Sequence, residues 1–498
     1  MNVNPITRLD YPDPDVIRVE DTYYMVSTTM HFMPGCEILQ SFDLVHWEHV
    51  TYVYETLDHT DAQQLKSGQN IYGQGMWAAS LRYHEGRFYI CFVANDTRKT
   101  YLYTSEKIDG PWKKQLIEGF YHDGSLLFDE DGRNYIVYGN DEIWITELNE
   151  DLTAPKKGGL HRLLVSDHKN PKLGYEGSHI QKINGYYYIF LIHSLRDRWM
   201  RTEACFYSDS LEGEFTGGDV LCDDRGYCGQ GVAQGGIVDT PDGKWYAMLF
   251  QDSGAVGRLP ILLPVTWKDH FPVFGQNGHV PEEIEVHSTR PGYIYQPLVG
   301  SDDFCNGLLP RWQFNHDPDP RYYHLDALQG TYTITTREVC TELTQAVNTL
   351  TQRMSYPSCA AEVTVDASAL KEGDVAGLCA LQSCYAAVGI TKHHGKYEVL
   401  MLDKKEDGIL DMTEGTVVES HQMDFRLEAD FCNMKDEARC YYRVNKGDWL
   451  PIGTVHKLYF KLDHFTGCRF GLFCYAAEET GGSACFRDFK YYDVDEIS

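Results

Sequence analysis

The sequence predicts an all-β protein in which a five-bladed β-propeller is followed by an antiparallel β-sandwich. Two observations support this fold class. An aromatic-rich strand pattern recurs five times before residue 280, and the rest of the chain contains regular short strands without that cadence. Patterns typical of helices are almost absent. The chain has 498 residues, which is long enough for two to four domains.

The repeat joins a Gly or Asp turn to an aromatic strand, a second strand and often an acidic turn. The aromatic strands begin near positions 23, 88, 135, 186 and 245, as in Asp-Thr-Tyr-Tyr-Met-Val-Ser (21–27) and Asp-Gly-Lys-Trp-Tyr-Ala-Met-Leu-Phe (242–250). A spacing of about 45–65 residues suits one four-stranded sheet per copy, which is the size of a propeller blade. The alternative is a large sandwich with coincidental Tyr-Tyr pairs.

A turn-rich stretch at 270–300 ends the repeat, and we place the domain boundary there. The prediction is a propeller over residues 1–298 and a sandwich over 299–498. Short alternating strands separated by turn signals are typical of an antiparallel, jelly-roll-like sandwich. The strands that we expect in it are 332–334, 360–365, 387–390, 396–400 and 486–492.

Charge and cysteine content restrict the function. Lys plus Arg total 44 against 73 Asp plus Glu, a formal net charge of −29. Such a chain repels nucleic acid and anionic membranes, so a neutral substrate is the expected partner. The start has no basic region followed by an apolar run, the pattern of a secretory signal peptide. No apolar segment is as long as the roughly 20 residues that span a membrane. The 15 cysteines are scattered without CxxC pairs, so we expect free thiols and a cytoplasmic location.

Three acids at widely separated positions each lie at or just before a predicted inner strand. They are Asp13 in Tyr-Pro-Asp-Pro-Asp (11–15), Asp123 in Tyr-His-Asp-Gly-Ser (121–125) and Glu176 in Gly-Tyr-Glu-Gly-Ser-His (174–179). A single Asp in such a turn is usually a turn residue. A propeller presents the entries of its inner strands on one face, so the set predicts carboxyl groups that meet at the axial funnel. Hydrolysis of a glycosidic bond needs two carboxyl groups in different states, one a protonated acid and the other an ionised carboxylate.

Several motifs in order resemble glycoside hydrolase family 43. They are the Asn-Pro-Ile start with Tyr-Pro-Asp-Pro-Asp, Ser-Phe-Asp-Leu-Val-His-Trp (41–47), Gly-Met-Trp-Ala-Ala-Ser-Leu (75–81), His-Asp-Gly-Ser-Leu (122–126) and Tyr-Glu-Gly-Ser-His (175–179). The C-terminal part resembles the concanavalin-like sandwich appended to the family's β-xylosidases, through Asp-Asp-Phe (302–304), Leu-Thr-Gln-Arg (350–353) and Gly-Asp-Val-Ala-Gly-Leu (373–378).

The resemblance implies an inverting mechanism and a role for each acid. Asp13 would be the general base that activates water, and Glu176 the general acid that protonates the departing oxygen. Asp123 would raise the pKa of that acid and hold its orientation. Inversion requires room for a water, so the carboxyls of base and acid should stand about 6.5–9.5 Å apart. The neighbouring acids Asp10, Asp15, Asp129 and Asp131 are weaker choices.

The resemblance also implies residues that contact the sugar. Arg258 matches a position where an arginine reaches into the sugar subsite, and Trp77, His31 and Phe32 resemble positions in its wall. His179 follows the acid closely and could hydrogen-bond a ligand or Asp123, with a structural histidine as the alternative.

Many relatives have an axial histidine near a calcium or other cation, and here Gln234 stands in the equivalent segment. An amide oxygen can ligate calcium, so a structural Ca²⁺ near Gln234 is one option. The inverting chemistry itself requires no cofactor.

The expected function is that of an exo-glycosidase that releases xylose from the non-reducing end of short β-1,4-xylo-oligosaccharides. An α-L-arabinofuranosidase, or a bifunctional enzyme, is the close alternative because the two pentoses present similar hydroxyl patterns. A non-catalytic carbohydrate-binding propeller with a lectin-like sandwich is a second class. A fructan- or sucrose-cleaving enzyme is a third, but its Asn-Asp-Pro-Asn and Arg-Asp-Pro motifs do not occur in the sequence. Assembly into a homo-oligomer stays open.

Overall fold

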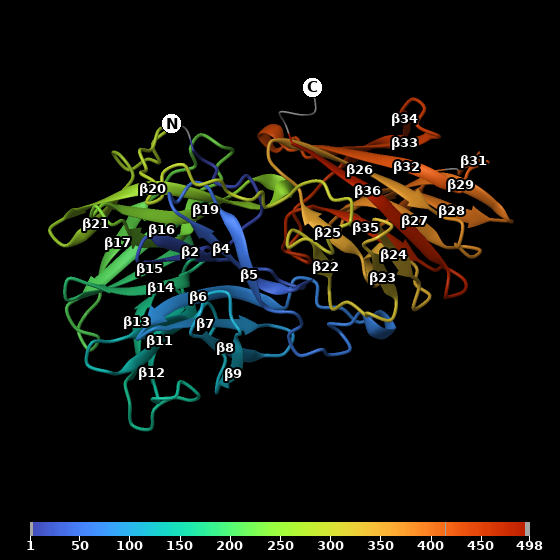
Figure 1. Ribbon diagram of the computed structural model, residues 1–498. Coiled ribbons are helices and arrows are strands. Elements are labelled where there is room, and N and C mark those ends of the chain that lie inside the picture. Colours follow the sequence, from blue (N-terminus) through green and yellow to red (C-terminus); the bar gives the residue numbers. More distant parts are fainter. Residues whose placement is uncertain (1–2, 414, 494–498) are drawn as a thin grey trace.

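The computed structural model describes residues 3–413 and 415–493 and confirms the predicted fold class (Figure 1). The described residues form two β-domains without an α-helix. The helical elements among them are four short 3-10 turns: η1 (Lys66–Gly68), η2 (Gly254–Val256), η3 (Leu343–Gln345) and η4 (Cys432–Met434). No helix in this part of the chain is long and apolar enough to cross a membrane.

The propeller has five blades, each a four-stranded antiparallel sheet built from consecutive segments. The aromatic strands of the repeat are the second strands of the blades. The second strands are β2 (Thr22–Val26), β7 (Arg87–Ala94), β11 (Asn134–Asn140), β15 (Tyr186–Ser194) and β19 (Trp245–Asp252). The third strands are β4 (Gly35–Ser41), β8 (Lys99–Ser105), β12 (Glu142–Leu148), β16 (Arg201–Ser208) and β20 (Arg258–Lys268). The outer strands are β5 (Glu48–Tyr54), β9 (Lys113–Ile117), β13 (His161–Ser166), β17 (Thr216–Leu221) and β21 (Phe271–Phe274).

The first strands of the blades surround the propeller axis. They are β1 (Asp15–Val19), β6 (Met76–His84), β10 (Ser125–Phe128), β14 (Glu176–Ile183) and β18 (Val232–Asp239). Each contacts the first strands of the two neighbouring blades, and β18 contacts β1, which closes the ring. Neighbouring blades pack face to face, and aromatic and β-branched side chains are buried between them. Side chains of these types are common in β-strands. The ring brings the entries of all five inner strands to one mouth.

The second domain is a sandwich of two antiparallel sheets around an apolar core, with a second, smaller apolar cluster beside it. One sheet contains, in order, β22 (Gln313–Asn315), β25 (Leu350–Arg353), β35 (Arg469–Tyr475), β27 (Val375–Leu381), β28 (Ala386–His393), β29 (Lys396–Lys404) and β30 (Leu410–Met412), with β31 (Thr416–Val418) beside β29. The other contains β23 (Tyr323–Asp326), β24 (Thr331–Thr335), β36 (Ser483–Asp493), β26 (Ser358–Asp366), β32 (Gln422–Asp430), β33 (Glu437–Val444) and β34 (Leu450–Lys457). The five strands expected from the sequence all lie within these elements.

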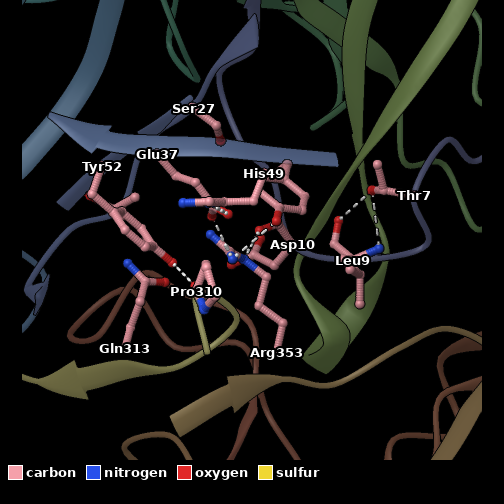
Figure 2. A network of polar contacts seen from close by, with 12 residues as sticks. Thr7, Leu9, Asp10, Ser27, Glu37, His49, Tyr52, Pro310, Gln313 and Arg353 are labelled. Carbon is pink, nitrogen blue, oxygen red and sulfur yellow. Dashed lines mark hydrogen bonds and ion pairs between the residues drawn. The ribbon is translucent and has the colours of Figure 1, made fainter. Parts of the chain in front are cut away.

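The two domains share a strand pair and a buried polar network. The two-residue strand β3 (Phe32–Met33), from a propeller loop, pairs with β22 and so extends the first sheet of the sandwich. Figure 2 shows the network beside it, in which the Arg353 guanidinium lies 2.8 Å from the Glu37 carboxylate. Arg353 also donates to the backbone oxygen of Asp10, and His49 contacts the other Glu37 oxygen at 3.0 Å. These contacts fix the sandwich against the mouth of the propeller.

Candidate active site

Asp13 lies in the turn that leads into β1, with its carboxyl side chain buried. Its φ of 52° is in the left-handed region, which Asp tolerates better than most residues. Thr28 donates a hydrogen bond of 2.6 Å to Oδ2, and Arg258 Nη1 lies 3.0 Å from Oδ1. Both carboxylate oxygens are therefore held in fixed directions.

Asp123 occupies the equivalent turn before β10, also with a left-handed φ, of 47°. Its Oδ2 accepts the backbone N–H of Gly177 at 3.0 Å, which ties blade 3 to the residue that follows Glu176. Burial raises the pKa of Asp123 to about 6; His122 opposes this shift, and the charges of Glu176 and Asp13 add to it.

Glu176 is the first residue of β14. Asn140, at the end of β11, donates a hydrogen bond of 2.8 Å to its Oε2. The Glu176 side chain is 19% exposed, against 8% for Asp13 and 6% for Asp123. Of the three acids, Glu176 is therefore the most accessible to a ligand that enters the mouth.

His122 lies between two of the acids and interacts with their charges. Its role was not predicted from the sequence. Its Nε2 lies 3.5 Å from both Asp123 Oδ2 and Glu176 Oε2. Burial lowers the pKa of His122, but the charges of Asp123, Glu176 and Asp13 outweigh burial and raise it to about 9. His122 is therefore an imidazolium at neutral pH. Asp123 and Glu176 thus meet at this ring. Asp13 is joined to the same ring through Arg258, Phe465 and Trp77, which contact one another in turn.

One side of the site is formed jointly by the propeller and the sandwich. The ring of Phe465, from the loop before β35, lies 4.4 Å from the guanidinium carbon of Arg258. Trp77 packs against the same ring at 5.6 Å between centroids and against His122 at 5.7 Å. The Nε of Arg258 and the indole N–H of Trp77 have no hydrogen-bond partner among the described residues. Both nitrogen atoms are buried within the wall.

His31 and Phe32 lie at the seam between the domains. They are 1% and 2% exposed. The ring of His31 packs near Tyr72 and two sandwich histidines, His316 and His464, and Phe32 faces the guanidinium of Arg469 at 3.5 Å. Both side chains are enclosed by these neighbours, and direct contact with a sugar stays a prediction.

His179 has a protein partner at one ring nitrogen. Its Nδ1 lies 3.0 Å from Oδ1 of Asp15, while Arg82 contacts the other oxygen of Asp15 at 2.8 Å. Asp123, which the sequence analysis considered as a partner, is not the group that Nδ1 contacts. The structure thus favours the structural alternative for His179, as one member of a chain of polar contacts between the inner strands.

The other neighbouring acids are also occupied by structural contacts. Asp10 accepts the backbone N–H groups of Arg258 and Gly467, both at 2.8 Å, and so joins the two domains. Asp129 accepts from Lys182 and from the hydroxyl of Tyr187. Asp131 pairs with Arg133 in an exposed hairpin turn. The preference for Asp13, Asp123 and Glu176 agrees with these contacts.

The surroundings of Gln234 do not fit the calcium site considered from the sequence. Its backbone N–H donates to Glu203 Oε2 at 2.7 Å, and burial raises the pKa of Glu203 well above its usual value, which favours the neutral acid. Calcium prefers a set of six to eight oxygens rich in carboxylates. In the described part of the chain, no group of three His, Cys, Asp or Glu side chains gathers around Gln234. We derive no step through a metal there.

Comparisons with known proteins agree with this geometry. Residues 3–272 match the family described as glycosyl hydrolases family 43, and residues 301–492 match the β-xylosidase C-terminal concanavalin A-like domain. A β-xylosidase from Formosa agariphila is 26% identical over 99% of this chain and 89% of its own length. A non-reducing-end α-L-arabinofuranosidase from Bacteroides ovatus is 24% identical over 82% of this chain and 79% of its own.

A solved structure from Bacteroides eggerthii, described as bifunctional GH43-CE, superposes with a TM-score of 0.93. It is 42% identical and covers 99% of this chain, which in turn spans 64% of that larger protein. Together with the convergent acids, these matches establish that the chain is an enzyme of glycoside hydrolase family 43, with a C-terminal concanavalin-like domain.

Proposed function

We propose that the protein is an inverting exo-β-xylosidase that removes xylose from the non-reducing end of short xylo-oligosaccharides. The observation that carries the proposal is the convergence of three acids with distinct surroundings at one mouth of the propeller. The wall built by Trp77, Arg258 and Phe465 limits the space on one side. A site that is walled on one side suits the end of a chain better than its middle.

In the proposed mechanism, Asp13 takes a proton from the attacking water. Arg258 and Thr28 hold its two oxygens, so the carboxylate is oriented before the substrate arrives. Glu176 gives a proton to the glycosidic oxygen as the bond to the anomeric carbon breaks. Asn140 and His122 both lie at Oε2 of Glu176, so Oε1 is the atom free to face that oxygen. The hydroxyl of the water thus ends on the anomeric carbon, its proton on Asp13, and the proton of Glu176 on the leaving alcohol.

Asp123 has a positioning role in this proposal. Its bond to the N–H of Gly177 fixes the start of β14, and its charge is shared with the His122 imidazolium. The charges of Asp123 and His122 act on each other, so the pKa values of these two groups belong to the pair. No metal or cofactor takes part in the proposed steps.

An α-L-arabinofuranosidase is the second candidate, because relatives of both kinds match most of the chain. The discriminating experiment compares kcat/KM on 4-nitrophenyl β-xyloside and 4-nitrophenyl α-arabinofuranoside, together with xylose release from xylobiose. Proton NMR of the first product formed reports inversion. We expect the xyloside to be preferred and α-xylose to appear first. A preference for the arabinofuranoside would select the alternative, and retention of configuration would contradict the mechanism.

A purely carbohydrate-binding protein is tested by Glu176→Ala. If this variant hydrolysed aryl xyloside as fast as the parent, the catalytic assignment would fail.

A further inference from the structure

The hairpin that joins β15 to β16, residues 195–200, lies at the same mouth as the catalytic acids. Glu176 at the start of β14 pairs with Ile192 in β15, which pairs in turn with Glu203 in β16. The hairpin extends beyond this level, because the last pair before it is Ser194 with Arg201. The loop therefore projects from blade 4, the blade that carries Glu176, above the level of that acid.

Arg201 connects this hairpin to the acids. Its side chain is buried, and its Nε donates a hydrogen bond of 2.6 Å to Asp252. Burial tends to lower the pKa of Arg201, but Asp252 and, with smaller contributions, Glu176 and Asp13 raise it overall. Arg201 also borders the site through Phe250, whose ring lies 5.3 Å from the guanidinium carbon of Arg201 and 5.4 Å from that of Arg258.

Trp199 covers Arg201 on the side of the hairpin. The guanidinium carbon lies 5.3 Å from the Trp199 ring and 5.3 Å from the Phe250 ring. Phe250 is fully buried, whereas Trp199 is 47% exposed. A tryptophan that keeps half of its surface in water offers an apolar face for a ligand, and the arginine beneath it fixes the ring.

Trp199 belongs to a different blade from the residues that form the wall of the site. Trp77, Arg258 and Phe465 come from blades 2 and 5 and from the sandwich. Trp199 comes from blade 4, which carries the residue proposed to protonate the leaving oxygen. The leaving group departs on the side of its proton donor, which is the side of blade 4.

We infer that Trp199 is the stacking platform for the first sugar on the leaving-group side of the scissile bond, a neutral pyranose such as the second xylose of xylobiose. This inference rests on the proposed function. The apolar C–H face of the pyranose packs on the indole, and the surrounding charges are internally paired, as for Arg201 with Asp252. Trp199 is thus a specificity residue that favours oligosaccharides over substrates with a small leaving group.

The test compares two substrates that share the xylose to be released. Xylobiose has a sugar on the leaving-group side, and β-xylosyl fluoride has none. For Trp199→Ala we expect kcat/KM on xylobiose to fall about tenfold or more, and kcat/KM on the fluoride to stay within about twofold. Trp199→Phe keeps an aromatic face and should recover most of the loss on xylobiose. Tyr83→Ala is the matched control, because Tyr83 is 45% exposed and lies at the far end of β6.

Each outcome decides the inference. An equal loss on both substrates would mean that Trp199 supports Arg201 or the hairpin fold, and would overturn it. An unchanged kcat/KM on xylobiose would overturn it as well. If the parent enzyme cleaved neither xyloside, the proposed function would fail, and this result is distinct from a failure confined to the Trp199 variants.

Discussion

The ring of Phe465 lies 4.4 Å from the guanidinium carbon of Arg258, although 207 residues separate the two in the chain. Arg258 in turn forms the 3.0 Å ion pair with Asp13. A residue of the sandwich is therefore one contact away from the proposed base. The second domain belongs to the active site as well as to the architecture.

The first prediction concerns this contribution of the sandwich. Phe465→Ala removes the ring that packs on Arg258 and Trp77, so both lose a fixed position relative to the sugar. We expect kcat/KM on 4-nitrophenyl β-xyloside to fall about tenfold or more. Leu462→Ala, on the same loop and 74% exposed, is the control and should leave kcat/KM unchanged. Equal kinetics for the two variants would remove Phe465 from the site.

The second prediction separates the base from the acid by the leaving group. Glu176→Gln cannot give a proton, so xylobiose hydrolysis should fall by about 10³-fold or more, whereas an activated dinitrophenyl xyloside should be affected far less. Asp13→Asn removes the base, which both substrates need, so both rates should fall by about 10³-fold. Steady-state kinetics on the two substrates test this. If the pattern were reversed, the two roles would have to be exchanged.

The propeller and its acids could be predicted because their signals are local. The aromatic strands recur within each blade, and Asp13, Asp123 and Glu176 each lie in a short motif before an inner strand. Phe465, Arg201 and Asn140 could not be found in this way. Their roles arise when segments far apart in the chain meet, and a loop phenylalanine or a strand-end arginine has no distinctive local pattern.

His122 shows a second limit of the sequence. It stood inside the His-Asp-Gly-Ser-Leu motif, yet its charge depends on its distance from two carboxylates, and the motif does not reveal that distance. Burial of His31 and Phe32 and the contact of His179 with Asp15 are likewise tertiary effects. The motif located these side chains near the site, but packing decided which groups they contact.

The third prediction concerns the ion pair between the domains. Arg353→Met leaves the Glu37 carboxylate buried without its arginine partner, in contact with His49, and removal of one member of a buried pair costs about 3–5 kcal/mol. We expect a clear fall in Tm. The double variant Glu37→Gln with Arg353→Met removes the stranded charge and should recover part of the loss. The exposed pair of Arg133 with Asp131 provides the comparison, because Arg133→Met should change Tm very little.

Arg353→Met should also affect catalysis. Arg353 binds the backbone oxygen of Asp10, whose carboxylate holds the backbone N–H of Arg258. A reduced kcat/KM at a temperature well below Tm would support this connection between the domain interface and the site.

An unchanged Tm of Arg353→Met would contradict the stability prediction. It would show that the strand pair and the apolar seam hold the domains together without Arg353.

The last prediction follows from the cost of keeping Asp123 ionised. The folded protein raises the pKa of this carboxyl from 3.8 to about 6, so folding favours its protonated form. The corresponding stability is fully present below pH 3.8 and is lost as the pH rises through 6. In Asp123→Asn the side chain is neutral at every pH, so this variant does not lose that stability as the pH rises. At pH 7 the variant should therefore be inactive or nearly so, yet more stable than the parent by about 1–3 kcal/mol.

The measurement is urea denaturation of both proteins at pH 4, 5 and 7. The difference in unfolding free energy should be small at pH 4, grow between pH 4 and 6 and stay constant above. Asp131→Asn, in an exposed hairpin, is the matched control and should show no such growth. A variant that is less stable than the parent at pH 7 would mean that the attraction between ionised Asp123 and the His122 imidazolium exceeds the cost of burial. In that case the acids of this site would be held together by the charge of His122, and Asp123 would be a stabilising partner instead of a strained one.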